Sequence, residues 1–319
     1  MNTIIGGNIN ADGTLYSGNY VSVIKESTGI YEITFAEAFS KVPSILLTQN
    51  HPSWGDFSSK GGSTIDNCTI IAVDKTKVKV KTGNSSGEVS NRNFSILAID
   101  SRETETDVGL VSGLVNADGT NVDDYPDFFT TKIDTGLYLI TFSQPFSEPP
   151  VITVLQNYPE WDQFNSDGGS THDNAVVVAV KKQQVLIKTG GGNGSASDRN
   201  FCFIACDPSF ASTSTTRKMA TGDINADGTI HSGDGFIAIH DDTGEYSCAF
   251  NSGTFSSSPA VIATQNYPGW SDFSSSGGST EDNCTLIAIN NTKCKIKTGG
   301  GNGSASDRNL SFVAMATLK

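Results

Sequence analysis

Hydrophobic residues alternate with polar ones over short stretches of this chain, and the whole series of stretches occurs three times. In residues 29–35, Tyr31, Ile33 and Phe35 lie on alternate positions, and residues 136–142 and 244–250 repeat the pattern. A period of two with aromatic and branched side chains predicts a half-buried strand. Because no window shows the spacing of an amphipathic helix, we expect an all-β chain.

Other stretches predict strands that are apolar on both faces. They are 68–73 with 175–180 and 284–289, and the closing 94–99 with 201–206 and 310–315. Between them, Val78 and Val80 alternate with lysines that we expect to point outward. Two-faced strands need cover on both sides, from a second sheet and from contact between repeats. We therefore predict three tandem antiparallel β-sandwich domains, arranged as an intramolecular pseudo-trimer.

The spacing of the repeat sets the domain boundaries. Trp54 and Trp161 are 107 positions apart, Trp161 and Trp270 are 109 apart, and Arg92, Arg199 and Arg308 keep the same two offsets. A period of about a hundred residues indicates one domain per repeat. We assign repeat 1 to 1–103, repeat 2 to 104–210 and repeat 3 to 211–319, with linkers near 100–108 and 207–221.

One polar loop in each repeat retains a tryptophan, which a turn or linker does not need. These aromatic loops (50–67, 157–174 and 266–283) keep Asn, Pro, Trp and Phe at fixed spacing and end in Gly-Gly-Ser-Thr-x-Asp-Asn. We interpret them as a binding surface.

Strand order predicts which loops share an end of each sandwich. With alternating strand directions, the aromatic loop, the glycine-rich loop (83–87, 190–194 or 299–303) and the turn 27–29 leave the same end. The Asn-Ala-Asp-Gly turn at 10–13 is expected at the opposite end. The predicted ligand-binding residues are Asn50, Trp54, Asp66, Asn67, Arg92 and Asn93; Asn157, Tyr158, Trp161, Asp173, Asn174, Arg199 and Asn200; and Asn266, Tyr267, Trp270, Asp282, Asn283, Arg308 and Asn309.

This set of side chains suits a sugar. A tryptophan offers a flat surface to the C–H face of a pyranose, and carboxylate, amide and guanidinium groups offer paired acceptors and donors. Glycines let the backbone approach a ligand closely. Two structural alternatives stay open: Trp54 plugs the end of the core, and Asp66 with Arg92 is an ion pair that pins two loops.

The charge balance excludes several partners. Lys and Arg number 21 against 34 Asp and Glu, a net charge of −13, so a nucleic-acid backbone or an anionic membrane surface meets net repulsion. No apolar run approaches membrane-spanning length, and the N-terminus lacks the features of a signal peptide. We expect no nucleic-acid partner and no membrane insertion, and either a cytoplasmic location or export by a non-classical route.

The six cysteines do not recur at matching positions in all three repeats: Cys68 and Cys284 match each other, but repeat 2 has Ala175 there, and others stand where another repeat has a hydrophobic residue. This distribution favours buried free thiols over disulfides. The chain has no cysteine and histidine cluster for zinc, and the Asn-Ala-Asp-Gly stretch is better read as a tight turn than as a calcium loop. We expect no metal and no cofactor.

Catalytic motifs are also lacking. The glycine-rich loop precedes a strand rather than a helix and has no Gly-Lys-Ser/Thr, which argues against phosphate binding. The shared loop set contains one invariant carboxylate, Asp66 and its counterparts, whereas glycoside hydrolysis needs two. We predict that the chain is not an enzyme.

Several motifs carry a resemblance to known modules: the Asn-x-Asp-Gly-Thr turn, Gly-x-Tyr-x-Ile-Thr-Phe, Phe-Ser-x-x-Pro and the closing Arg-Asn-Phe-Ser. In these the repeat resembles the small β-sandwich modules at the tips of bacterial and phage tail fibres. It is more distantly similar to H-type lectin domains, which assemble as trimers and bind N-acetylgalactosamine-like sugars. The resemblance implies a trimer-like fold and a sugar ligand.

The sequence therefore predicts a multivalent lectin that binds glycans or glycoconjugates, with one sugar site at the loop end of each repeat. We expect a monomer with internal threefold pseudo-symmetry that can oligomerise further. The alternative is a structural or adhesion module that recognises a protein or a cell-surface receptor.

Overall fold

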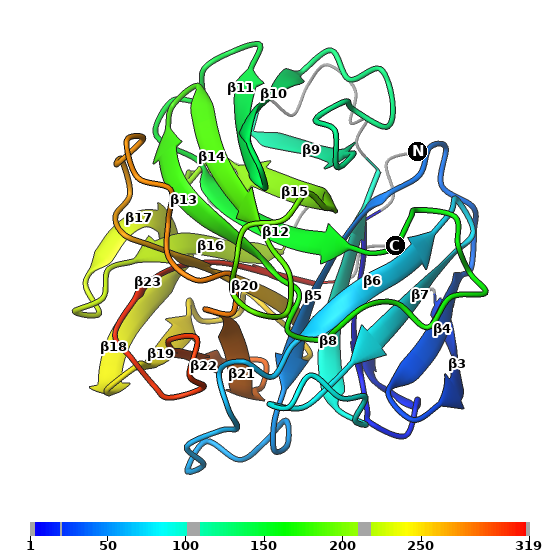
Figure 1. Ribbon diagram of the computed structural model, residues 1–319. Coiled ribbons are helices and arrows are strands. Elements are labelled where there is room, and N and C mark those ends of the chain that lie inside the picture. Colours follow the sequence, from blue (N-terminus) through cyan, green and yellow to red (C-terminus); the bar gives the residue numbers. More distant parts are fainter. Residues whose placement is uncertain (1–3, 20, 101–108, 210–217, 317–319) are drawn as a thin grey trace.

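The computed structural model describes residues 4–19, 21–100, 109–209 and 218–316. Every regular element in these ranges is a β-strand, which confirms the all-β prediction (Figure 1). Most of the two predicted linkers lies outside the described residues.

The described part of repeat 1 contains eight strands: β1 (Ile4–Ile9), β2 (Leu15–Gly18), β3 (Val21–Ser27), β4 (Ile30–Phe35), β5 (Ser44–Asn50), β6 (Cys68–Val73), β7 (Lys77–Thr82) and β8 (Asn93–Ile99). The described part of repeat 2 contains β9 (Leu110–Val115), β10 (Phe128–Asp134), β11 (Leu137–Phe142), β12 (Val151–Asn157), β13 (Ala175–Lys181), β14 (Gln184–Thr189) and β15 (Asn200–Cys206). The described part of repeat 3 contains β16 (Met219–Ile224), β17 (Ile230–Asp234), β18 (Phe236–Asp242), β19 (Glu245–Phe250), β20 (Ala260–Asn266), β21 (Cys284–Ile289), β22 (Lys293–Thr298) and β23 (Asn309–Met315).

Each repeat is a sandwich of two sheets. In repeat 1 the outer sheet has the order β3-β4-β7-β6 and the inner sheet the order β5-β8-β1-β2. Their equivalents in repeat 2 are β10-β11-β14-β13 and β12-β15-β9, with Tyr138, Phe142, Phe201 and Phe203 buried between them. Alternating aromatic and branched residues on facing strands supply this core, as the periodicity predicts.

The inner sheet of each repeat continues into the outer sheet of another repeat. β5 lies parallel to β21, β12 to β6 and β20 to β13, each joined through one pair of residues. The three continuous sheets therefore each combine strands from two repeats, and every repeat shares a sheet with both of the others. In Figure 1 the three sandwiches surround the strands β5, β12 and β20.

These three central strands are buried along their whole length. One face packs inside its own sandwich. The other contributes Leu46, Leu155 and Ile262 to a cluster shared by the repeats. Contact between repeats thus supplies the second cover that strands with two apolar faces require.

All six cysteines are buried and carry no disulfide, as their scattered positions predict. Cys248 on β19 and Cys294 on β22 lie directly opposite one another, in the places of Ile33 and Val78 in repeat 1. Burial raises the pKa of the Cys284 and Cys68 thiols, which keeps them protonated. The cysteines serve as small hydrophobic residues.

A buried carboxyl distinguishes repeat 3. Asp223 on β16 accepts hydrogen bonds from the hydroxyls of Ser232 (2.7 Å) and Ser311 (2.6 Å). Burial raises its pKa to about 7. The corresponding residue of repeat 1 is Asn8, which donates to the Ser17 hydroxyl and to the Pro259 carbonyl. An uncharged amide fills the same place there without a cost of ionisation.

We expect Asp223→Asn to remove a pH-dependent loss of stability. Because the folded state raises this pKa above its usual 3.8, the carboxyl stabilises the fold fully below about pH 4. That contribution falls as the pH rises through 7, by up to about 4 kcal/mol. Urea unfolding between pH 4 and 8 should show the parent losing stability relative to Asp223→Asn, and Asn8→Asp should introduce a similar loss. Parallel pH profiles for parent and Asp223→Asn would contradict this assignment.

Candidate ligand-binding site

All three tryptophans are held by a hydrogen bond from the indole; Trp54 is buried, whereas Trp161 and Trp270 are partly exposed. Trp54 is 5% exposed, and its indole N–H donates to the Asn10 side-chain oxygen at 2.8 Å. The other two indoles make the same bond, Trp161 to Asn116 and Trp270 to Asn225. The only N–H donor of each indole is therefore used within the protein and is not free to bond a ligand.

Aromatic rings also cover two of the tryptophans. Tyr16 stacks on Trp54 with ring centroids 5.2 Å apart, and His231 stacks on Trp270 at 4.8 Å. Val122 takes this place in the repeat 2 sequence. Trp54 closes the end of a core, which was one of the two structural alternatives. The core that it joins is that of repeat 3.

The Asn-Ala-Asp-Gly turn lies beside Trp54, so its expected placement at the opposite end of the sandwich is wrong. The Ala11 N–H donates to the Asn93 side chain at 2.9 Å, and Tyr31 donates to the Ala11 carbonyl. Two strands, β2 and β3, separate this turn from the turn 27–29, and two strands bring the chain back to the end where it started. The two turns would lie at opposite ends only if a single strand separated them. The turn 27–29 does lie beside the glycine-rich loop, as predicted, since Gly29 bonds to Asn91 and to Thr82.

Six of the predicted asparagines join strands rather than face solvent. The Asn50 amide donates to the carbonyls of Leu286 and Ile287 on β21, and Asn93 donates to the Asn50 oxygen. The pairs Asn157 with Asn200 and Asn266 with Asn309 repeat this arrangement. These side chains satisfy backbone groups where two repeats meet, which is what a buried junction between sheets needs.

The asparagines that close the aromatic loops connect the three repeats in a cycle. Asn67 donates to the carbonyl of Asp173, Asn174 to that of Asp282, and Asn283 to that of Asp66. Asn283 also donates to the Asn67 oxygen at 3.1 Å. All three are at least nine-tenths buried. They lie away from any surface at which a sugar could bind.

The predicted arginines and aspartates do come together. The Arg92 Nη2 atom lies 3.6 Å from the Asp66 carboxylate, and the Arg199 Nε atom lies 3.7 Å from that of Asp173. Burial raises the pKa of Asp66 and Asp173, and the neighbouring arginine partly offsets this rise. Asp282 and Arg308 show the same balance. The ion pair that pins two loops, left open by the sequence, is therefore present in repeats 1 and 2.

A tyrosine completes this group in repeats 2 and 3. The Arg199 guanidinium lies 4.5 Å from the centroid of the Tyr158 ring, and that of Arg308 lies 4.6 Å from Tyr267. Both rings are 38% exposed. The Nε atoms of Arg199 and Arg308 are buried and make no hydrogen bond. An exposed ring thus lies beside guanidinium donors and above a buried carboxylate.

Repeat 1 departs from this pattern because His51 replaces the tyrosine. Burial and the Arg92 charge lower the pKa of His51, so its imidazole is neutral at pH 7. Of the predicted site, repeat 1 keeps Asp66 and Arg92 side by side but has no exposed ring over them.

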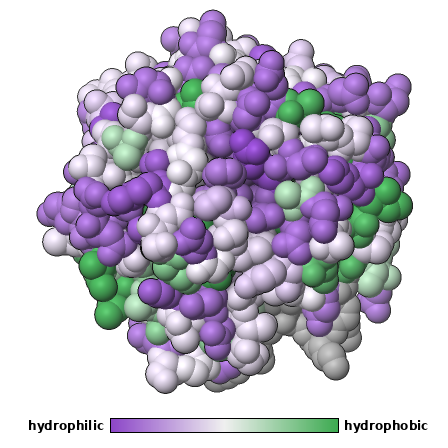
Figure 2. Space-filling view, turned by 90° about the horizontal axis from the view of Figure 1, so that it is seen from below, coloured by the Kyte–Doolittle hydropathy of each residue, from purple (hydrophilic) through white to green (hydrophobic). Residues whose placement is uncertain are grey.

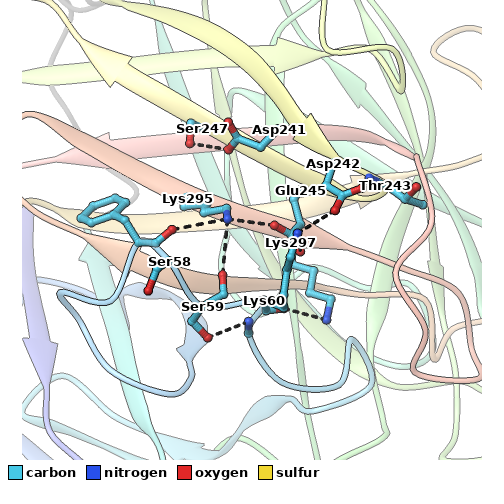
Figure 3. A network of polar contacts seen from close by, with 12 residues as sticks. Ser58, Ser59, Lys60, Asp241, Asp242, Thr243, Glu245, Ser247, Lys295 and Lys297 are labelled. Carbon is cyan, nitrogen blue, oxygen red and sulfur yellow. Dashed lines mark hydrogen bonds and ion pairs between the residues drawn. The ribbon is translucent and has the colours of Figure 1, made fainter.

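The aromatic loop has a second role that the sequence analysis missed. The loop of each repeat lies across the outer sheet of a neighbouring repeat, where buried lysines bind its backbone. Lys297 donates to the carbonyls of Lys60 and Gly62, and Lys295 donates to Ser59 and forms an ion pair with Glu245 (Figure 3). Equivalent bonds join Lys81 to Asp167 and Gly169, and Lys188 to Gly278. We call this contact the lysine clasp.

The loop phenylalanines pack in the same place. Lys77 and Lys293 lie over the rings of Phe164 and Phe57, and Phe164 contacts the buried Ile71 and its neighbours. The strand lysines were expected to point outward from the core. They do leave the sandwich core, but the neighbouring loop covers them, and their alternation with valines gave no sign of this cover.

The first residue of each glycine-rich loop is also explained by contact between repeats. A Cβ atom on Gly83, Gly190 or Gly299 would lie 2.0–2.1 Å from the hydroxyl of Thr171, Thr280 or Thr64 of another repeat. Only glycine fits so close an approach. At these positions the close neighbour is a threonine rather than a ligand.

No protein-family model, curated protein or solved structure matches the chain. Within the described ranges there is no helix that is long and apolar enough to cross a membrane. The same ranges hold no group of three or more His, Cys, Asp or Glu side chains that could bind a metal ion.

We expect Lys297→Met to destabilise the protein by about 2 kcal/mol, because two partly buried carbonyls lose a charged donor. Lys60→Met is the control: its ammonium is exposed and pairs with the exposed Asp242 and with the buried Glu245, which retains Lys295 as a partner, so a cost of at most about 1 kcal/mol is expected. Chemical unfolding of both variants tests the clasp. Equal costs would show that the bonds from Lys297 contribute no more than the ion pairs of Lys60.

Proposed function

We propose that the chain is a non-enzymatic, multivalent carbohydrate-binding protein whose main sites are the tyrosine, arginine and aspartate groups of repeats 2 and 3. One observation carries the proposal. In both repeats a tyrosine that is 38% exposed lies against an arginine guanidinium, beside a largely buried aspartate carboxylate.

The chemistry of this group favours an uncharged sugar. The ring offers an apolar face for the C–H bonds of a pyranose, and the guanidinium offers donors for hydroxyl oxygens. Because the Asp173 carboxylate lies close to Arg199, the pair carries little net charge and provides no strong attraction for an anionic sugar. The gap beneath Tyr267, lined by Gly278, Ser279 and Asp282, has no room for a water molecule. A sugar would therefore bind on the outer side of the ring.

The tyrosine is not required by the fold. Repeat 1 forms the same loop with His51, and its tryptophan and its closing asparagine make the same hydrogen bonds as in the other two repeats. The tryptophans and the asparagines have structural contacts that account for them, whereas the exposed tyrosine faces do not. This difference shifts the proposed sugar contacts from Trp161 and Trp270 to Tyr158 and Tyr267.

Several sites on one chain would gain affinity on a surface that presents many sugars. The shared sheets and the cyclic asparagine contacts support a pseudo-trimer, in which each repeat takes the place of one subunit. Sites held at fixed separation on one scaffold bind a glycosylated surface with higher avidity than any one site alone.

The rival function is a structural or adhesion module that recognises a protein. The lysine clasp favours it, because it shows that much of the aromatic loop stiffens the assembly. The face seen in Figure 2 is mostly hydrophilic, and its hydrophobic areas are small and separate, so this face has no broad apolar patch of the kind that marks many protein-binding sites. The two functions differ in whether a free sugar is bound.

The double variant Tyr158→Ala/Tyr267→Ala is expected to lower glycan-array binding by about tenfold, since each site loses its stacking face. Tyr16→Ala is the matched control: it removes an exposed tyrosine that covers Trp54 instead of an arginine, and binding should persist. A sugar identified on the array should also raise the melting temperature of the parent but not of the double variant. Binding unchanged in the double variant would refute the proposed site, and the absence of any sugar effect would favour the adhesion module.

A further inference from the structure

Repeat 2 has an open groove that arises from a change in its strand pattern. In repeats 1 and 3, β2 and β17 pair with β1 and β16. In the described part of repeat 2, β9 has only an isolated bridge between Val115 and Asn121 at this place. Asn8 and Asp223 each form a hydrogen bond with a serine of the paired strand. Repeat 2 has Leu114 at this position, which cannot form that bond. Without that polar contact, the chain diverges after Val122.

The divergence leaves a groove of about 590 Å³ between the residues that follow the turn and strand β10. This volume lies within the range of small-molecule sites. Its lining combines carboxylates with an aromatic ring: Asp123, Asp124, Phe129, Asn121 and Thr130. Phe129 is 55% exposed, and Thr130 donates to the Asn121 oxygen at 2.9 Å, which fixes one wall.

The corner beside this groove already holds an ammonium group. The Lys41 Nζ atom lies 3.6 Å from the Asp123 carboxylate and 5.5 Å from the centroid of the Tyr125 ring. Carboxylates and aromatic faces both attract ammonium ions, and the two together bind organic amines. Asp124 is exposed and forms no ion pair within the described ranges, so the groove offers a second carboxylate near a second ring.

We propose that this groove binds an organic ammonium ion, with the Asp124 carboxylate and the Phe129 ring as its main contacts and Asp123 as a weaker one. The net charge of −13 also favours a cation. The proposal does not depend on the sugar sites, which lie in other loops. A free amine and the lysine side chain of a partner would present the same chemistry, and the probes below separate quaternary from primary ammonium groups.

The test is an amide NMR titration of the whole chain with n-butylammonium, with choline and with 3,3-dimethylbutanol, the uncharged analogue of choline. Butylammonium, choline or both should shift the amides of Gly119, Thr120 and Thr130, and dimethylbutanol should not. The stronger of the two cations identifies the ammonium class. Equal shifts with the uncharged probe, or no shifts at these residues with either cation, would overturn the proposal.

Four variants sharpen this test. Asp124→Asn should weaken ammonium binding by about three- to fivefold, the range of a partly exposed ion pair. Phe129→Ile, which installs the residue that repeat 3 has at this place, should weaken it by removing the π face while keeping an apolar side chain. Glu148→Gln, an equal change of charge away from the groove, should leave binding unchanged. Lys41→Met frees Asp123 and should strengthen binding, an outcome that misfolding cannot produce.

If Glu148→Gln weakens binding as much as Asp124→Asn does, and Lys41→Met strengthens it by the same factor, the probes sense net charge alone and the site is refuted.

Discussion

The fold depends on the burial of three strands that no single repeat can cover. β5, β12 and β20 have apolar side chains on both faces, and their own sandwich shields only one of them. The other repeats supply the second cover, and each central strand also extends a neighbouring sheet. The aromatic loop follows its central strand directly, so the same junction carries the loop onto the neighbouring sheet, where the lysine clasp holds it.

This constraint decides which residues remain for function. The asparagines at the strand ends, the tryptophans and the first glycine of each glycine-rich loop are all occupied by contacts within or between repeats. What is left at the loop end is the exposed tyrosine with its arginine and aspartate. A residue that recurs in all three repeats therefore need not bind a ligand. A structural contact that forms three times keeps the residue in the sequence equally well.

The strands and the repeat could be predicted because each depends on local pattern or on spacing. Alternation in 29–35 identifies β4, and the scattered cysteines predict free thiols. The contacts between repeats could not be predicted, since the lysines of β7 and β22 look the same whether water or a neighbouring loop covers them. The place of the Asn-Ala-Asp-Gly turn was predicted wrongly because residues 15–27 form two strands, with β2 ending at Gly18 and β3 beginning at Val21, and the second strand returns the chain to the end where it began. Tyr158 and Tyr267 were identified, but their pairing with arginine needed the structure.

The cyclic sharing of sheets has a consequence for the number of repeats. In a solenoid each end unit keeps one unpaired face, so units can be gained or lost along an open array. Here the inner sheet of repeat 1 pairs with repeat 3, as those of repeats 2 and 3 pair with repeats 1 and 2, so each of the three junctions between repeats is already paired within the described residues. Removing any one repeat would leave an unpaired strand edge on each of the other two.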